Sequence, residues 1–229
     1  MKTVAIFIIA AIIFIANTYG QDKRPFTDSF MQDSCMFSSI GRNAYFILEP
    51  GWQLVLEGVE DEDTARLVIT VLNETKMVGG VETRVVEENE SVSGGTVEIS
   101  RNFFAFCKQT GSIFYFGEEV DMYYQGKITG HSGAWIAEGN NKAGIIMPGV
   151  FLLGSRYYQE IAPGIAMDRA EIISISETYE TRAGKFTNCL KTEETSGLNP
   201  KEKEFKHYAP GIGLIQDENL LLVKYGFVK

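Results

Sequence analysis

The chain has 229 residues, a net charge of −9 and three cysteines. An acidic chain without a basic run lacks the positive surface that nucleic acids and anionic lipid headgroups require, which excludes those two partner classes. Three widely spaced cysteines in a chain of this length also exclude a small disulfide scaffold.

The first twenty residues have the pattern of a secretory signal peptide. Lys2 precedes an unbroken apolar run, Val4–Ala16, and small residues follow it. A run of 13 residues is short for a bilayer-spanning helix, which needs about 20 residues, and is typical of a cleavable signal. We expect cleavage near Gly20–Gln21, no stable membrane span afterwards, and a secreted or periplasmic protein. An uncleaved N-terminal anchor is the alternative.

The remaining chain divides into two parts. Residues 21–43 are polar and irregular, and predict a flexible N-terminal segment. From 44 to 229 apolar and polar residues alternate with a period of two, which predicts one β-rich domain. The expected strands lie at Trp52–Gly58, Leu67–Lys76, Val81–Val86, Phe103–Cys107, Ile113–Phe116, Tyr123–Ile128 (a hairpin), Arg156–Ile161, Ala170–Thr181, Phe186–Thr192, Glu204–Tyr208 and Leu220–Val228.

Short strands without intervening helices define the fold class that we expect. It is all-β, a mainly antiparallel curled sheet (half-barrel, barrel or sandwich) with few helices. Four Pro-Gly pairs should form tight turns, because proline presets φ for the second turn position and glycine supplies the positive φ that follows in a type II turn. These pairs are Pro50-Gly51, Pro148-Gly149, Pro163-Gly164 and Pro210-Gly211.

The sequence around the last of these turns is similar to a motif of a known protein family. The phrase Tyr208–Ile215 resembles the C-terminal Y-A-P-G-[VI]-G-L-[VI] motif of a family of uncharacterised exported bacterial β-rich proteins. Its ending is also similar, on this one turn, to half-barrels of the periplasmic lipoprotein-carrier type. The resemblance covers most of residues 43–216 and implies a β fold and an envelope role, but no activity. Further segments similar to that family are Tyr45–Trp52, Tyr115–Glu118, Gly144–Gly149, Tyr158–Glu160 and Ala166–Asp168.

The cysteines admit two interpretations. An exported chain can form one disulfide among Cys35, Cys107 and Cys189. Cys107 and Cys189 lie in apolar, alternating stretches, where cysteine commonly serves as a small hydrophobic side chain. We favour core filling over a structural disulfide, because a domain of this size does not depend on a covalent link.

One segment imitates a hydrolase. Gly130–Ala134 contains Ser132 in a context similar to the G-x-S-x-G nucleophile elbow, and Asp168 and His207 follow in the order of a catalytic triad. That elbow requires a helix after the serine, whereas strand-like residues and two asparagines follow here. The sequence therefore favours a glycine-rich connection, and we assign no catalytic residue.

Metal binding is the other chemical alternative. His131 and His207, with Trp135, would form a copper site, since imidazole suits copper. The two histidines have no local companion at ligand spacing, so the sequence favours no metal and no cofactor. The acidic runs Glu60–Asp63 and Glu87–Glu90 lack the layout of a calcium loop and are interpreted as solvated turns.

Aromatic residues provide the candidate binding site. Consecutive aromatics in a strand face opposite sides of the sheet, so one set meets either a second layer of a sandwich or a concave apolar groove. The groove residues that we expect are Tyr115, Trp135, Tyr157 and Tyr208. The function predicted is therefore that of a non-catalytic exported envelope protein, which binds an apolar small molecule or an envelope component, or serves as a scaffold. The alternatives are the copper protein and a small secreted hydrolase.

Overall fold

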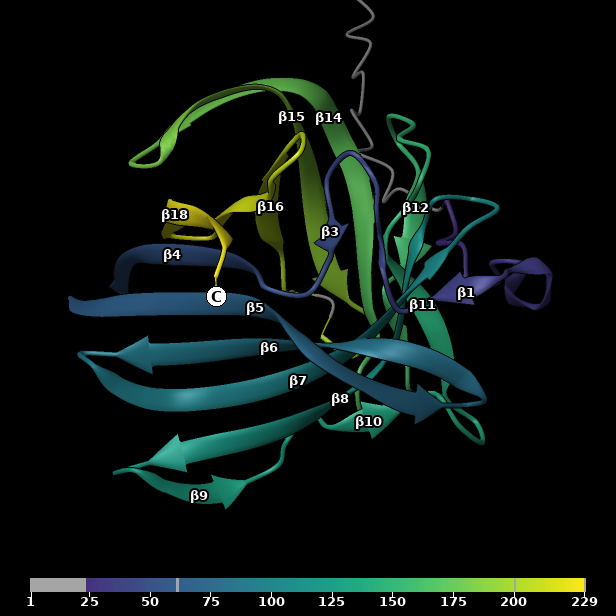
Figure 1. The fold of residues 1–229 in the computed structure, drawn as a ribbon, viewed down its shortest axis with the longest axis horizontal. Helices are drawn as coiled ribbons and strands as arrows, with labels where there is room; N and C mark the ends of the chain where they lie inside the picture. The colour runs from purple at the N-terminus through teal and green to yellow at the C-terminus, as the bar shows by residue number, and fades with distance from the viewer. Residues whose placement is uncertain (1–23, 61, 200, 229) are drawn as a thin grey trace, which may run out of the picture.

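The computed structural model describes residues 24–60, 62–199 and 201–228. The expected signal peptide at residues 1–20 lies outside the described residues. Within them the fold prediction is confirmed, because the chain forms a nearly closed, antiparallel, barrel-like sheet (Figure 1). The only helical element of the described chain is one 3-10 turn, η1 (Gln32–Ser34).

The main sheet follows one path around the barrel, and every pairing along it is antiparallel. In spatial order its strands are β12 (Arg156–Tyr158), β14 (Asp168–Thr181), β15 (Gly184–Ser196), β16 (Glu204–Ala209), β17 (Gly213–Asp217), β18 (Leu220–Phe227), β4 (Trp52–Glu60), β5 (Asp63–Val78), β6 (Val81–Val92), β7 (Gly95–Cys107), β8 (Ile113–Tyr124), β11 (Lys142–Met147) and β13 (Glu160–Ile161). Beside this path β1 (Phe37–Ser38) pairs with β7, and β9 (Lys127–Gly130) and β10 (Trp135–Ile136) pair with β8. A separate ladder joins β2 (Gly41–Arg42) to β3 (Ile47–Leu48).

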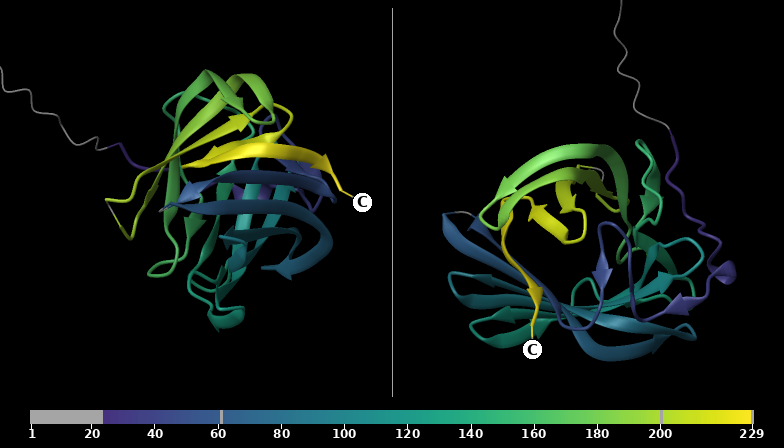
Figure 2. Two further views of the ribbon diagram at one scale, coloured as in Figure 1. Left: turned by 90° about the vertical axis from the view of Figure 1, so that its left-hand side faces the viewer. Right: turned by 45° about the horizontal axis from the view of Figure 1, so that its top comes forward.

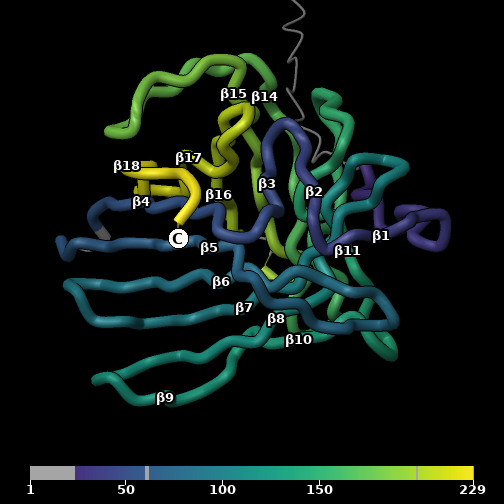
Figure 3. Tube along the Cα trace, viewed as in Figure 1, coloured from purple at the N-terminus to yellow at the C-terminus, as the bar shows by residue number. Residues whose placement is uncertain are grey.

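Two features bring the sheet round into a barrel. The late strand β18 pairs with the early strand β4, with Leu222 opposite Leu56, and the two run side by side in Figure 3. The strands at the two ends of the path, β12 and β13, are separated along the chain by Gln159 alone. The two edges of the sheet therefore meet.

Three of the four Pro-Gly pairs have the expected turn geometry. Gly51, Gly164 and Gly211 have φ values of 86°, 80° and 73°, in the left-handed region that favours glycine. Gly149 is required for a different reason. A Cβ at that position would lie 2.0 Å from the carbonyl oxygen of Thr110, so its backbone approaches the neighbouring turn too closely for any side chain.

The N-terminal segment at residues 24–43, expected to be irregular and flexible, is attached to the barrel at several points. The Thr27 N–H donates to the Arg156 carbonyl oxygen, and the Tyr158 N–H donates to the Thr27 carbonyl oxygen, each at 2.9 Å. The ring of Phe26 lies 4.1 Å from the guanidinium carbon of Arg156 and 4.5 Å from that of Arg169. The segment thus continues the edge of the sheet beside β12.

A disulfide fixes the same segment to β7. Cys35 and Cys107 are bonded, across 72 residues of sequence. Core filling was therefore the wrong interpretation for Cys107, where the alternation of an apolar strand concealed a covalent partner far along the chain. It is confirmed for Cys189, which is buried and free.

Residues 43–48, here called the inner loop, lie inside the ring of strands (Figure 2, right). The Asn43 side-chain amide donates to the carbonyl oxygens of Gly111 and Pro148, both at 3.1 Å, and the Tyr45 hydroxyl donates to the Asn188 carbonyl oxygen at 2.7 Å. These bonds reach opposite parts of the sheet. The inner loop is consequently held between its walls.

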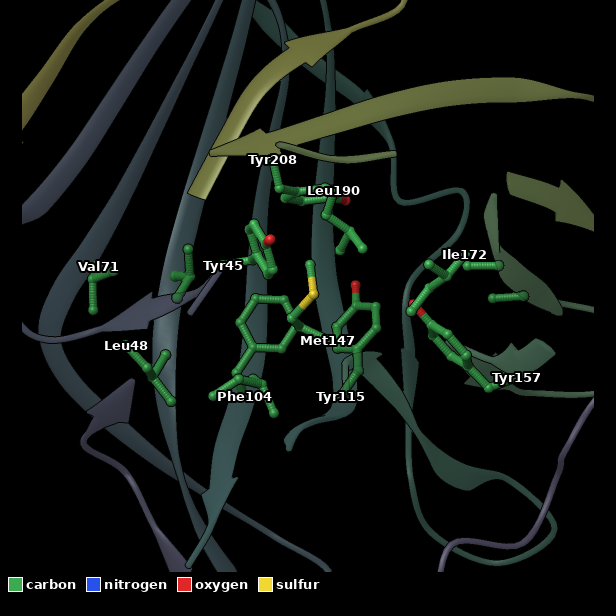
Figure 4. Packing of buried hydrophobic residues seen from close by; sticks show 14 of the residues in the cluster. Tyr45, Leu48, Val71, Phe104, Tyr115, Met147, Tyr157, Ile172, Leu190 and Tyr208 are labelled. Atoms are coloured by element: carbon green, nitrogen blue, oxygen red, sulfur yellow. The ribbon is translucent and has the colours of Figure 1, made fainter. Parts of the chain in front are cut away.

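The largest apolar cluster forms around this loop (Figure 4). Tyr45 and Leu48 contribute from the inner loop, and they meet side chains from β6 to β8 on one side and from β14 to β16 on the other. Buried members include Val86, Phe104, Tyr115, Met147, Tyr157, Ala170, Ile172, Leu190 and Tyr208. The interior of the barrel is thus packed as a core next to the loop, and opens into a cavity beyond it.

Candidate functional site

The interior cavity has a volume of about 390 Å³, a size that is ordinary for a small-molecule site. The walls come from strands β4 to β8, β11 and β13 to β17, together with the inner loop. Side chains from strands far apart in the sequence therefore face one space, because the sheet curls back on itself.

Part of the cavity wall is apolar. The apolar lining consists of Phe46, Ile47, Trp52, Leu54, Ile69, Val71, Val86, Phe104, Ile146, Ile212 and Leu214. Trp52 is fixed in place by its indole N–H, which donates to the Ile212 carbonyl oxygen at 3.1 Å. This lining is continuous with the apolar clusters of the core.

The other part of the wall is acidic. The acidic lining consists of Glu88, Glu90, Glu98, Glu118, Glu160, Asp168, Glu194 and Asp217, and Lys206 is the one basic residue among the described residues that line the cavity. The inward-facing side chains change from apolar to acidic along the length of the strands. Along the paired strands β6 and β7 the inward positions run from Val86 opposite Asn102, through Glu88 opposite Ser100, to Glu90 opposite Glu98.

Lys206 neutralises one corner of the acidic lining. Its Nζ lies 3.4 Å from Glu194 Oε2 and 3.4 Å from Asp217 Oδ2. Glu194 also accepts hydrogen bonds from Gln159 at 3.2 Å and from Thr192 at 3.1 Å. Burial alone would lower the pKa of Lys206, but the carboxylates of Asp217 and Glu194 outweigh it and raise that pKa well above its usual value. The charged groups at this corner of the cavity are therefore paired with one another.

Glu160 is in the opposite situation. Only 8% of its surface is exposed, and its Oε2 forms no hydrogen bond with any described residue. Burial raises the pKa of Glu160 well above its usual value, and the carboxyls of Glu118 and Asp168 raise it further. The neighbouring indole of Trp135 and the charge of Lys206 lower this pKa only in part. A buried, unsatisfied carboxyl oxygen is costly, and Glu160 is one of the residues that line the cavity.

Two further carboxyls share this electrostatic environment. Burial raises the pKa of Glu118 to about 7, although the Tyr115 hydroxyl offsets part of the rise. Burial also raises the pKa of Glu88 to about 8, against the opposing charge of Lys206. Burial and mutual repulsion therefore keep these carboxyls partly protonated near neutral pH.

The four residues expected to form an aromatic groove are distributed between wall and core. Tyr115 and Tyr208 line the cavity. Trp135 is buried on β10 and packs on Tyr115 with ring centroids 5.4 Å apart, so it supports the wall from behind. Tyr157 is buried in the core cluster and does not belong to the lining.

The acidic lining was missed in the sequence. The run Glu87–Glu90, interpreted as a solvated turn, lies in the middle of β6, and Glu88 and Glu90 face the cavity. The turn interpretation was wrong because acidic residues at inward positions oppose the usual hydrophobic pattern of a strand. The spacing was informative, since Val86, Glu88 and Glu90 share one face by the period-two rule. The other run, Glu60–Asp63, does connect two strands, β4 and β5.

The two histidines lie in different settings. His131 is exposed on the outside of the sheet, with its Nδ1 at 2.9 Å from Asp121 Oδ1. His207 is buried on β16, 2.5 Å from Gln216 Oε1, and its ring lies against Tyr179 at 4.3 Å. Within the part of the chain that the structure describes, no group of three potential ligands could hold a metal ion.

The hydrolase-like segment has no helix after the serine. Ser132 lies in the turn between β9 and β10, where the Ala134 N–H donates to the His131 carbonyl oxygen at 3.3 Å. The other two members of the imitated triad, Asp168 and His207, lie in the cavity lining and in the sheet beneath Tyr179, respectively. This arrangement differs from the strand–turn–helix geometry of a nucleophile elbow.

Comparison with known proteins identifies no relative. No family model, no curated protein and no solved structure matches the chain. Among the described residues, no helix is both long enough and apolar enough to cross a membrane. The class that the fold and cavity define is a barrel-like β domain with an internal, partly acidic cavity.

Proposed function

We propose that this domain binds a small organic cation that also carries an apolar group, and that it acts as an exported, non-catalytic binding protein. The single observation that carries the proposal is Glu160, a buried carboxyl with an unpartnered oxygen, in a cavity lined by eight carboxyls and one lysine. A ligand ammonium group would provide the missing hydrogen bond and the missing positive charge together.

The two linings suit the two ends of such a ligand. An alkyl or aryl group would displace water from Phe46, Trp52 and Leu214, and its burial would contribute about 25 cal/mol per Å² of apolar area. The ammonium group would approach Glu160. A purely apolar ligand, as the sequence suggested, would instead leave the acidic lining unsatisfied, and an anionic ligand would be repelled.

Three probes that share one hexyl chain test the charge requirement. Binding of n-hexylamine, n-hexanol and n-hexanoate to the purified domain is measured by isothermal titration calorimetry, with Trp fluorescence as a second signal because Trp52 lines the cavity. We expect the protonated amine to bind at least ten times more tightly than the alcohol, and the carboxylate not to bind. Equal affinities for amine and alcohol would contradict the proposal.

Paired variants locate the effect. Glu160→Gln should weaken hexylamine binding by about tenfold or more, since one charge-assisted contact is lost. The control is Glu180→Gln, an exposed position near the end of β14 that is not part of the lining. An equal loss in both variants would indicate attraction to the acidic surface as a whole rather than binding in the cavity.

A further inference from the structure

We propose that the ligand of this cavity carries two or more positive charges, as an N-alkyl diamine or a polyamine does. This inference rests on the proposed function and narrows its substrate class. Three observations support it: the charge balance of the carboxyls, the strands that carry them, and their failure to converge on one point.

The charge balance of the lining is the first step. Lys206 pairs with Glu194 and Asp217, and five further carboxyls of the lining lie outside those two ion pairs: Glu88, Glu98, Glu118, Glu160 and Asp168. Among these five, both Glu118 and Asp168 raise the pKa of Glu160 by direct repulsion. A ligand with one positive charge would offset only part of this repulsion.

The origin of the carboxyls is the second step. Glu88 and Glu118 come from β6 and β8, Glu160 comes from β13, which follows β8 and β11 along the sheet, and Asp168 comes from β14 near the other end of the path. Acidic groups therefore approach the cavity from more than one wall. One ammonium group has three N–H donors in a compact cluster, and a second ammonium group is needed to reach carboxyls on another wall.

The spread of the carboxyls is the third step, and it separates an organic polycation from a metal ion. A divalent metal requires several oxygens converging within about 2.0–2.6 Å of one point. The described residues contain no group of three that could hold a metal ion. Two amines on a flexible chain place two charges several ångströms apart, which matches dispersed carboxyls.

The test adds one probe to the hexyl series. N-hexyl-1,3-diaminopropane has the same alkyl group as n-hexylamine and one more amine. We expect it to bind at least ten times more tightly at about 0.15 M salt, with a steeper loss of affinity as salt increases. Titration in two buffers of different ionisation enthalpy should show more protons released by the diamine, because each added charge allows a further carboxyl to ionise.

Variants of the dispersed carboxyls complete the test. Glu118→Gln and Asp168→Asn should each reduce the ratio of diamine to monoamine affinity by about threefold or more, whereas Glu180→Gln should leave the ratio unchanged. Because the ratio is compared within each variant, a loss of folded protein affects both probes equally, and circular dichroism checks folding. If the diamine binds more tightly but the ratio of diamine to monoamine affinity is the same in all three variants as in the unmodified protein, the inference is wrong.

Two outcomes separate this inference from the proposed function. If hexylamine and the diamine bind equally well, the requirement for two charges is wrong and the proposed cation site stands. If neither amine binds, both proposals are wrong.

Discussion

The apolar lining and the acidic lining occupy the same interior, but burial stabilises the side chains of the first and destabilises the charged side chains of the second. Phe104 and Val71 in the apolar lining are at most 3% exposed and belong to the main core cluster. Glu160 in the acidic lining is nearly as buried, yet burial works against its charged form. A sequence selected for stability alone would fill both places with hydrophobic side chains. The cost in the acidic lining is therefore evidence of a function there.

The largest effect should come from breaking the apolar lining. Phe104→Ala removes a buried ring that contacts Tyr115 at 4.8 Å between centroids, and should lower the free energy of unfolding by about 3–5 kcal/mol. Urea denaturation monitored by Trp fluorescence measures the change. The matched change in the acidic lining, Glu98→Gln, should cost little or even stabilise. A similar loss in both would remove the distinction between the linings.

The disulfide provides the next largest effect. Cys35→Ser with Cys107→Ser opens a covalent loop of 72 residues and should lower the free energy of unfolding by about 2–4 kcal/mol. Cys107 lies at the end of β7, beyond the residues of that strand that line the cavity, so affinity for hexylamine should fall much less than stability does. Thermal melts and calorimetry on the same samples measure the two quantities. A parallel loss of binding would show that the N-terminal segment supports the acidic lining.

The pH dependence of stability isolates the acidic lining. The folded pKa values of Glu88 and Glu118, about 8 and 7, exceed the unfolded value of 4.5. Between pH 4.5 and these higher pKa values, the folded state keeps protons that the unfolded state has already released. This contribution to stability is present below pH 4.5 and is lost as the pH rises through 7 to 8. We expect a decrease of at least about 1 kcal/mol between pH 5 and pH 8.5.

Variants identify the groups responsible for that decrease. Glu88→Gln or Glu118→Gln should reduce it, and the exposed control Glu180→Gln should not. The buried His207 acts in the opposite direction, because burial lowers its pKa and stability gained from it rises with pH. The comparison is therefore made between variants across the same pH range. Unchanged slopes in both cavity variants would contradict the assignment.

The smallest effects should come from the histidines. His131→Gln changes an exposed side chain and should alter the free energy of unfolding by less than about 0.5 kcal/mol. His207→Gln should cost about 1 kcal/mol, because it disturbs the buried contacts with Gln216 and Tyr179. Neither change should affect hexylamine affinity. A loss of binding in either variant would return the histidines to consideration as site residues.

The sequence predicted the barrel-like sheet because period-two alternation and glycine turns are local signals. Strands such as β5 and β14 are longer than expected, since pairing in the sheet extends them through polar stretches. The cavity was predictable only in part. Tyr115 and Tyr208 were found as aromatics, but Glu88 and Glu160 were not, because a buried carboxyl contradicts the pattern used to find buried residues.

Non-local contacts were also out of reach of sequence reasoning. The disulfide partner of Cys107 lies 72 residues away, and no spacing rule points to Cys35. The inner loop is fixed by hydrogen bonds from Asn43 and Tyr45 to backbone carbonyls on strands and turns far along the chain. Such acceptors carry no side-chain signature, so their identity depends on the folded topology.

The pairing of β18 with β4 has a consequence for biogenesis. Leu222 lies opposite Leu56, so one edge of β4 stays unpaired until residues synthesised much later have emerged. Sheets with such high contact order fold slowly, and an unpaired edge strand is a template for aggregation in the meantime. The newly synthesised chain is therefore most prone to aggregation before β18 has paired with β4. Removal of residues 220–227 should leave one edge of β4 permanently unpaired and promote edge-to-edge association of chains.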